Sequence, residues 1–492
     1  MRKNYSNSLD KNGHLLSLSN DTLVYGAGLA LTNGLAFLTF PLLARHLSIG
    51  DYGTYDLYAT ISVLISVLIT FGIDSSVGRF FHEYETVQKR KELVSQALVL
   101  QVVIIVFFLF ILWIASSYTS EQLSKTNNSN LIYELVLAQV PFAVLLNFSL
   151  NLLKWSFAKW QFIFLSGLAA LLNIVFLAVT IFYLKIDLIN IFEMILIGKV
   201  CAAMVGLYLI SNWLQIPQNF HFIKQIVRFA FPIGLVCIID VSIPVVERGI
   251  VNNIINAEAL GQYAAASKVV LIITLFSQAF QSAWGPFSIS IYKQKSADKI
   301  FSLVVKMFVL FMCAMSLLIT ILGPEILDFL AGVRYSNAYL IIFPLTMSFV
   351  VQSTSWITEI GLGISKKTHL NFYSHFLHLI ISALIIYFLT FNYGMIGTAY
   401  GVLSAQIIRT LIISVLAQKA HFIDWPFKFI GLILAINLTI GVGWLILPEV
   451  YKNSMSTTLI LIYVIFLIIC AKNIYSNNDR NQRLNGKMNE QA

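Results

Sequence analysis

The chain has 492 residues, of which 58% are hydrophobic and only 11% are charged. Roughly a quarter of the residues in a typical soluble domain carry a charge, so this composition excludes an ordinary soluble protein. The net charge of +9 is compatible with nucleic-acid binding or with basic loops beside a membrane, and the pattern of apolar stretches favours the membrane.

Apolar stretches recur about fourteen times along the chain. Each is near or above the ~20 residues that a tilted helix needs to cross the ~30 Å hydrocarbon core of a bilayer. These runs are too long and too uniformly apolar for barrel strands. The predicted fold is an all-α polytopic membrane protein with about 14 transmembrane helices. The predicted spans are residues 22–44, 54–77, 93–116, 131–153, 161–184, 189–213, 226–247, 264–289, 301–323, 337–363, 370–391, 395–417, 427–447 and 455–474.

Positive charge alternates between the connections of these spans. When basic residues near a span end are counted with the adjoining connection or tail, 23 of the 32 Lys and Arg residues fall to the two tails and the even-numbered connections, six fall to the odd-numbered connections, and Lys199, Lys268 and Arg409 remain within spans. Lys and Arg in short loops are retained on the cytoplasmic side, so the tails, residues 1–20 and 475–492, are both predicted to be cytoplasmic. This asymmetry also accounts for the net charge, and no nucleic-acid partner is predicted.

The connections show no feature of an enzyme. All are too short for a folded soluble domain, and no G-x-x-x-x-G-K-[ST] motif for nucleotide phosphates occurs. The four cysteines, Cys201, Cys237, Cys313 and Cys470, lie within spans and have neither a disulfide framework nor zinc spacing. We therefore predict a protein without catalytic activity, cofactor or metal.

An internal repeat marks the openings of two spans. Gly53 and Tyr55 at the second span correspond to Gly261 and Tyr263 at the eighth. Six spans separate the copies, so the halves share one orientation and are related by an axis along the membrane normal. This predicts two six-helix bundles, residues 21–213 and 214–420, facing each other across a central cavity. Two additional helices follow in residues 421–474.

Two runs in the first half carry a resemblance to a known family. Phe40-Pro-Leu-Leu-Ala-Arg-His-Leu-Ser-Ile-Gly-Asp-Tyr-Gly-Thr-Tyr55 and Gly72-Ile-Asp-Ser-Ser-Val-Gly-Arg79 resemble the opening of bacterial polysaccharide flippases of the multidrug/oligosaccharidyl-lipid/polysaccharide exporter (MOP) superfamily. In the second half Glu247-Arg248, Gly261-Gln-Tyr263, Lys268 and Trp284-Gly-Pro286 are also similar to that family. The resemblance extends over about residues 20–420.

This resemblance implies export of an undecaprenyl-diphosphate-linked oligosaccharide repeat unit from the cytoplasmic to the periplasmic leaflet. The product would serve a surface polysaccharide such as O-antigen or capsule. It further implies the bacterial inner membrane as the location. The expected partners are the lipid-linked oligosaccharide, membrane lipid and other polysaccharide assembly proteins.

A diphosphate headgroup needs cations in the cavity, and five basic residues are candidates. Arg suits bidentate contact to phosphate, whereas Lys acts as a point charge. Lys268 lies a turn or more inside the eighth span and is the strongest candidate. Arg45, Arg79 and Arg248 lie near span ends, where snorkelling to the interface is the alternative explanation. Arg409 lies within the twelfth span.

Polar residues of the eighth span add candidate contacts for the sugar. Gln278 and Gln281 form a polar face that leads to Trp284. The amides would hydrogen-bond to sugar hydroxyls and the indole would offer a stacking surface. The alternative for Trp284 is membership of an ordinary interfacial aromatic belt.

Acidic and imidazole side chains within the spans are candidates for coupling or gating, because a charge inside a bilayer usually faces a cavity or a partner. Asp240 is the deepest carboxylate and shares a helical face with Pro244 and Glu247. The alternative is an ion pair of Asp240 with a basic neighbour such as Lys268. The further candidates are Asp74, Glu359, His375 and His378. For the last three, interhelical hydrogen bonding is favoured over a proton relay.

The sequence thus predicts a flippase that works by alternating access. An inside-negative membrane potential favours outward movement of a diphosphate by ~2.3 kcal/mol per charge per 100 mV, so ATP is not required. Coupling to H⁺ or Na⁺ antiport is an additional possibility. One alternative is a cation-coupled multidrug antiporter of the same superfamily, which predicts an acidic, aromatic cavity instead of a basic one. A second is a membrane glycan polymerase or ligase, a class that normally has a sizeable periplasmic loop.

Overall fold

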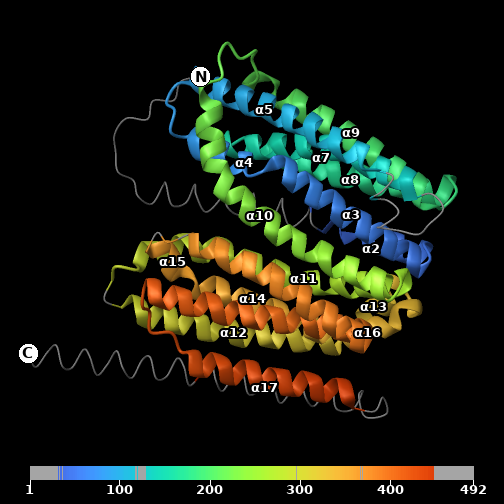
Figure 1. The fold of residues 1–492 in the computed structure, drawn as a ribbon, viewed down its shortest axis with the longest axis vertical. Coiled ribbons are helices and arrows are strands. Elements are labelled where there is room, and N and C mark those ends of the chain that lie inside the picture. Colours follow the sequence, from blue (N-terminus) through green and yellow to red (C-terminus); the bar gives the residue numbers. More distant parts are fainter. Residues whose placement is uncertain are drawn as a thin grey trace, which may run out of the picture. The chain divides into compact units, whose positions relative to one another are not determined.

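The computed structural model describes residues 32, 34–35, 37–116, 119, 129–294, 296–365, 367, 369–447 and 472. Every regular element within these ranges is helical (Figure 1). Eleven helices of this part are long and apolar enough to cross a membrane. The protein is therefore an all-helical, multi-pass membrane protein, and the predicted fold class is confirmed.

The predicted spans from the second to the thirteenth fall largely on described helices, and the second and the tenth are each divided between two of them. The first span, residues 22–44, is described only in part. The last span, residues 455–474, and both predicted tails lie outside the described residues except for Lys472.

Contacts divide the chain into two compact units. The first comprises Met1–Leu47 and Leu57–Val241, and the second comprises Ser48–Asp56 and Ser242–Ala492. The two stretches Ser48–Asp56 and Ser242–Ala492 are distant in sequence but belong together. The two bundles predicted from the internal repeat, residues 21–213 and 214–420, are defined by sequence symmetry and not by contacts. They stay predictions.

The first unit is a set of helices packed around α7. Helix α7 packs against α8 and α9, and α4 packs against α5 and α7. Val77, Leu152 and Ile226 are fully buried in its core. Its elements are α2 (Thr39–His46), the larger part of α3 (Ile49–Thr70), α4 (Ile73–Phe81), α5 (Val87–Ile114), α7 (Ser129–Trp155), α8 (Lys159–Tyr183), α9 (Leu188–Ile210), η1 (Ser211–Trp213) and the first part of α10 (His221–Ile254).

The predicted span 54–77 is interrupted in the structure, where α3 ends at Thr70 and α4 begins at Ile73. Phe71 and Gly72 between them have φ values of 44° and 72°. A Cβ on Gly72 would lie 2.8 Å from the carbonyl oxygen of Ala230 in α10. Glycine at residue 72 therefore permits both the left-handed backbone and the close approach of α10.

One face of α5 shows how the first unit meets the membrane. Val103, Phe107 and Phe110 lie at helical spacing on this face and are about 60% exposed. A helix that exposes large apolar side chains in this way is stable where lipid covers them. The sequence predicts this helix correctly because apolar residues occur on all of its faces.

The second unit is built around α14. Helix α14 packs against α11, α12 and α16, and α12 also packs against α17. Phe343 and Val350 on α14 are fully buried. The unit contains the start of α3, the end of α10, α11 (Ala257–Ile291), α12 (Ala297–Ile321), α13 (Gly323–Ala331), η2 (Val333–Ala338), α14 (Tyr339–Thr358), α15 (Ile360–Ile364), α16 (His369–Ala420) and α17 (Phe427–Ile446).

Helix α16 contains the two predicted spans 370–391 and 395–417. Gly394 between them has φ 60° and ψ −143°, which are not helical. The hydroxyls of Thr390 and Thr398 lie 2.9 Å apart, and a Cβ on Gly401 would meet Ile386. The two halves are thus antiparallel and closely packed, as the predicted connection at residues 392–394 requires.

Candidate functional site

A buried carboxylate, Asp56, lies in the second unit between two basic side chains. Arg248 Nε donates to Asp56 Oδ2 over 2.6 Å, and Lys268 Nζ lies 3.2 Å from Asp56 Oδ1. The Asp56 side chain is only 3% exposed. Three helices, α3, α10 and α11, each supply one member, so the ion pairs connect segments that are far apart in the sequence.

Neighbouring groups orient the Arg248 guanidinium. Its NH1 group donates to the carbonyl oxygen of Pro244 over 3.3 Å. Its central carbon lies 5.9 Å from the ring centroid of Tyr263, within the range of a cation–π interaction. These contacts leave Arg248 with little freedom to turn away from Asp56.

A second buried carboxylate adjoins this pair. Tyr263 donates its hydroxyl hydrogen to Glu247 Oε2 over 2.8 Å, and Glu247 is 8% exposed. We call Asp56, Glu247, Arg248, Tyr263 and Lys268 the buried ionic cluster. With both carboxylates ionised its charges balance, so no excess charge has to be accommodated inside the helices.

Lys268 differs from Arg248 in its exposure. Its side chain is 32% exposed, whereas that of Arg248 is 11% exposed. Lys268 therefore pairs with Asp56 and still presents part of its side chain to the outside. Of the two basic residues in the cluster, Lys268 is the more exposed and Arg248 is nearly buried against Asp56.

Arg409 lies elsewhere in the second unit, on α16. Its NH2 group lies 2.8 Å from Nε2 of His375, and both side chains are buried. Because Arg has only donors, His375 Nε2 accepts this hydrogen bond and carries no proton. His378 is buried on the same helix, and Glu359 follows the end of α14. The described residues contain no group of three or more His, Cys, Asp or Glu that could hold a metal ion.

The remaining basic and acidic candidates of the first unit are more exposed. Arg79 pairs with Glu83 at 2.8 Å on the surface of α4, and Arg45 is exposed near the end of α2. Asp74 accepts from the backbone nitrogen of Ser75 over 2.8 Å. Their roles at a headgroup site stay predictions.

Asp240 and Glu247 have different surroundings although they share a helical face. Asp240 is exposed and lies in the first unit, whereas Glu247 is buried against Tyr263 in the second. The carboxylate that pairs with Lys268 is Asp56. The alternative of an ion pair between Asp240 and a basic neighbour stays a prediction.

The candidate sugar contacts on α11 also differ in exposure. Gln278 and Gln281 are exposed, whereas Trp284 is 5% exposed. Trp284 is stacked with Phe280 at a ring-centroid distance of 6.0 Å and meets the edge of Phe301 at 5.4 Å. In this structure the indole is part of an aromatic core, and its stacking on a sugar stays a prediction.

Two members of the buried ionic cluster are absent from the sequence-based candidates. Asp56 is a carboxylate inside the predicted span 54–77, and that position alone marks it as a functional or paired residue. Tyr263 is part of the internal repeat. The signal for both is present in the sequence, but their partners 192 and 16 positions away are visible only in the fold.

The comparisons with known proteins agree with this architecture. A model of the family described as "Polysaccharide biosynthesis protein" matches residues 18–287. The comparison with curated proteins gave no match. Among solved structures, the fold is similar to the lipid II flippase MurJ in an inward closed conformation, with a TM-score of 0.72 and 14% identity over 94% of this chain and 99% of that one.

Two MATE transporters share the fold as well. An inward-facing multidrug resistance MATE family transporter of the MOP superfamily has a TM-score of 0.66 and 12% identity over 79% of this chain and 93% of that one. The Vibrio cholerae MATE transporter VcmN, solved as a point mutant, has a TM-score of 0.58 and 12% identity over 82% and 98%. These likenesses show that the chain has the same fold as these transporters, and the family match, which covers more than half of the chain, shows that it belongs to the polysaccharide biosynthesis protein family.

Proposed function

We propose that this protein is a flippase that moves a polyprenyl-diphosphate-linked oligosaccharide repeat unit from the cytoplasmic to the periplasmic leaflet by alternating access. The observation that carries the proposal is the family match over residues 18–287. The MurJ-like fold supports it, because that neighbour is described as a lipid II flippase. The bacterial inner membrane as location and cytoplasmic termini belong to the same proposal.

The membrane potential supplies a driving force for this transport. A diphosphate carries about two negative charges, and ~2.3 kcal/mol per charge is available at 100 mV, inside negative. Outward movement is thus favoured by ~4–5 kcal/mol. A coupled H⁺ or Na⁺ would add to this driving force, and Asp240 is our proposed carrier because it is the exposed carboxylate of α10.

Within the second unit, we propose Lys268 as the phosphate contact. Its ammonium group lies beside a buried carboxylate and its side chain is partly exposed, so an arriving phosphate would compete with Asp56 for it. Arg248 would then hold Asp56 in place. This arrangement lets a ligand bind without leaving Asp56 as an unpaired buried charge, which would be costly.

The MATE neighbours favour one second candidate, a cation-coupled multidrug antiporter. An acidic cavity would suit cationic drugs. The charge balance of the buried ionic cluster, with two basic residues beside two carboxylates, gives no excess of negative charge for such a ligand. The family match over residues 18–287 leads us to rank the flippase first.

Deletion of the protein tests the proposal. We expect lipid-linked repeat units to accumulate on the inner leaflet, and surface polysaccharide to be lost, with both restored by the wild-type chain on a plasmid. Drug susceptibility is measured in the same strains. Unchanged polysaccharide together with increased sensitivity to cationic drugs would refute the flippase and support the antiporter.

A further inference from the structure

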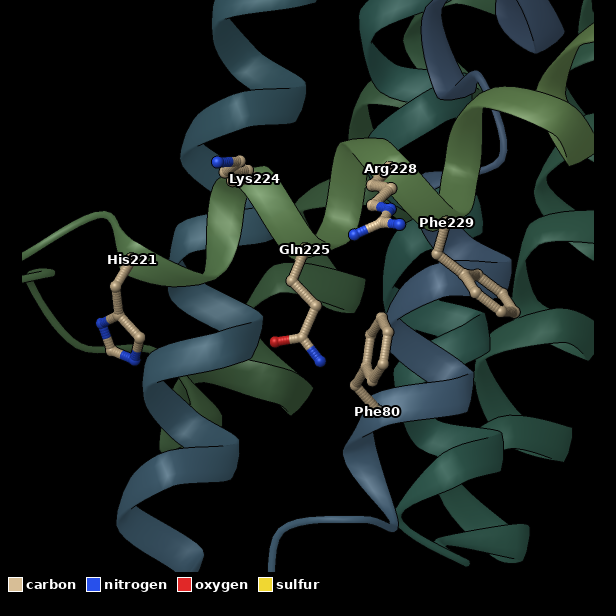
Figure 2. Close-up of a pocket in the computed structure, with 6 residues that line it drawn as sticks. All are labelled: Phe80, His221, Lys224, Gln225, Arg228 and Phe229. Carbon is tan, nitrogen blue, oxygen red and sulfur yellow. The ribbon is translucent and has the colours of Figure 1, made fainter.

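A pocket with a volume of about 460 Å³ lies in the first unit, beside the start of α10 (Figure 2). Residues of α10 line it at positions i, i+3, i+4 and i+7, so they share one face of the helix. Two phenylalanine rings complete it. We call it the basic pocket; its lining residues are Phe80, His221, Lys224, Gln225, Arg228 and Phe229.

Two cations of the basic pocket have no counter-charge among the residues that the structure describes. Lys224 and Arg228 are exposed and one helical turn apart, and neither has an ion pair or hydrogen bond within the described part of the chain. Like charges at this spacing repel each other. The first turn of α10 also contains no acidic residue, so no side chain of that turn offsets the positive end of the helix dipole beside Lys224.

His221, in contrast to Lys224 and Arg228, has polar partners. Its Nδ1 atom lies 3.8 Å from Glu92 Oε1 and is hydrogen-bonded to Asn219 Oδ1. Glu92 is thus engaged at the His221 end of the pocket. The excess of positive charge remains at Lys224 and Arg228.

The other walls suit an anion that is attached to a larger group. The Phe80 and Phe229 rings meet edge to face with centroids 5.5 Å apart. Tyr84 donates to Gln225 Oε1 over 3.1 Å, which leaves the Gln225 amide hydrogens for a ligand. Figure 2 shows the Gln225 amide and the Arg228 guanidinium on the same side of α10, next to the Phe80 ring.

We infer that the basic pocket binds the phosphate group of a lipid headgroup, and that its ligand in the cell is the diphosphate of the lipid-linked oligosaccharide. Arg228 and Lys224 bind the phosphate oxygens, Gln225 donates to them, and the aromatic rings contact the attached sugar or chain. A volume of about 460 Å³ exceeds the need of a lone phosphate and is in the usual range of small-molecule sites. The assignment of the lipid-linked oligosaccharide as the ligand in the cell rests on the proposed function.

The location of the pocket gives it a place in transport. Lys224 and Arg228 belong to a connection that the charge count predicts to be cytoplasmic. A site there would hold the headgroup in the leaflet from which it is collected. Binding at the basic pocket would then precede contact with Lys268.

Native mass spectrometry of the purified full-length protein tests the inference with three probes: undecaprenyl diphosphate, phosphatidylglycerol and inorganic pyrophosphate. We expect the Lys224→Gln/Arg228→Gln variant to bind undecaprenyl diphosphate about tenfold or more weakly, because two charge-assisted contacts are lost. The matched control is Lys299→Gln/Lys419→Gln, which removes the same charge at two exposed lysines of the second unit and should bind as the wild type does. Equal binding by wild type and the pocket variant would overturn the inference.

The three probes separate the possible sources of the phosphate. Tightest binding of undecaprenyl diphosphate supports the substrate; equal or tighter binding of phosphatidylglycerol or pyrophosphate overturns that assignment. The binding experiment tests only the basic pocket. The proposed function is tested separately, by the accumulation of repeat units in the deletion strain. A chain whose deletion has no such effect, but whose pocket variant loses lipid, has an anionic-lipid site and a different transport substrate.

Discussion

Gly53 and Gly261, the two glycines of the internal repeat, lie against each other in the second unit. A Cβ on Gly53 would come within 2.5 Å of the Gly261 backbone nitrogen, and a Cβ on Gly261 would overlap the Ile49 carbonyl oxygen. The start of α3 and the start of α11 therefore touch through their backbones. This contact places Asp56 and Lys268 close enough to pair.

We expect Gly53→Ala to destabilise the protein by about 1–3 kcal/mol, because the added methyl group meets backbone that cannot move aside easily. The measurement is the thermal midpoint of the detergent-solubilised protein. Gly249→Ala in α10 is the control, since nothing lies within 4 Å of its Cβ position. A Gly53→Ala protein as stable as the control would show that the two helices are not this close.

Removal of Asp56 should be more costly still. Asp56→Asn leaves Arg248 and Lys268 with one carboxylate between them, and breaking a buried ion pair costs about 3–5 kcal/mol. We expect low membrane abundance and a lowered thermal midpoint. Glu83→Gln, which removes the exposed partner of Arg79, should change stability by less than ~1 kcal/mol.

The double variant Asp56→Asn/Lys268→Gln tests whether charge balance is the cause. It leaves Glu247 and Arg248 as one acid and one base, so abundance should recover in part. If the double variant is less abundant than Asp56→Asn alone, the loss of Lys268 does not offset the loss of Asp56. Charge balance is then not what stabilises the buried ionic cluster.

The fold was largely predictable because lipid imposes a simple rule on apolar segments. Helix α5 and the two halves of α16 follow from length and hydropathy alone. The break at Phe71 and Gly72 did not, since a left-handed pair inside an apolar run has no periodic signal. The approach of Ala230 that accompanies it depends on a helix more than 150 positions away.

The candidate site was predictable in its residue types but not in its pairings. Lys268 and Arg248 stand out as charges in or beside apolar spans. Their shared partner Asp56 opens a span that also contains a repeat motif, so its carboxylate was less conspicuous. The basic pocket was predicted only as part of a basic connection, because its aromatic residues come from two separate helices.

Lys268 has a testable role beyond its ion pair. We expect Lys268→Ala to reduce export of repeat units by more than it reduces membrane abundance, because Arg248 still pairs with Asp56 and Lys268 is partly exposed. Lys268→Arg should retain part of the export, since it keeps the charge. Wild-type export by Lys268→Ala would remove this residue from the site.

Orientation can be measured with single cysteines in a background where Cys201, Cys237, Cys313 and Cys470 are replaced. Gln88 and Lys185 are both exposed and lie in connections predicted to face opposite sides. Lys185→Cys should react with an impermeant maleimide in intact cells, and Gln88→Cys only after the membrane is opened. The reverse pattern would invert the predicted topology.

Asp240→Asn separates ion coupling from structure at the proposed carrier. The variant keeps the shape and hydrogen-bonding groups of the side chain but fixes it as neutral, so a carboxylate that must gain and lose H⁺ or Na⁺ stops cycling. Because Asp240 is exposed on α10, we expect normal membrane abundance. Transport in proteoliposomes should lose its response to an imposed H⁺ or Na⁺ gradient yet keep its response to an electrical potential, which acts on the substrate's own charge. Asp240→Glu serves as the control and should retain the gradient response. A variant that still follows the ion gradient would exclude Asp240 as the carrier, and a poorly inserted one would assign it a structural role instead.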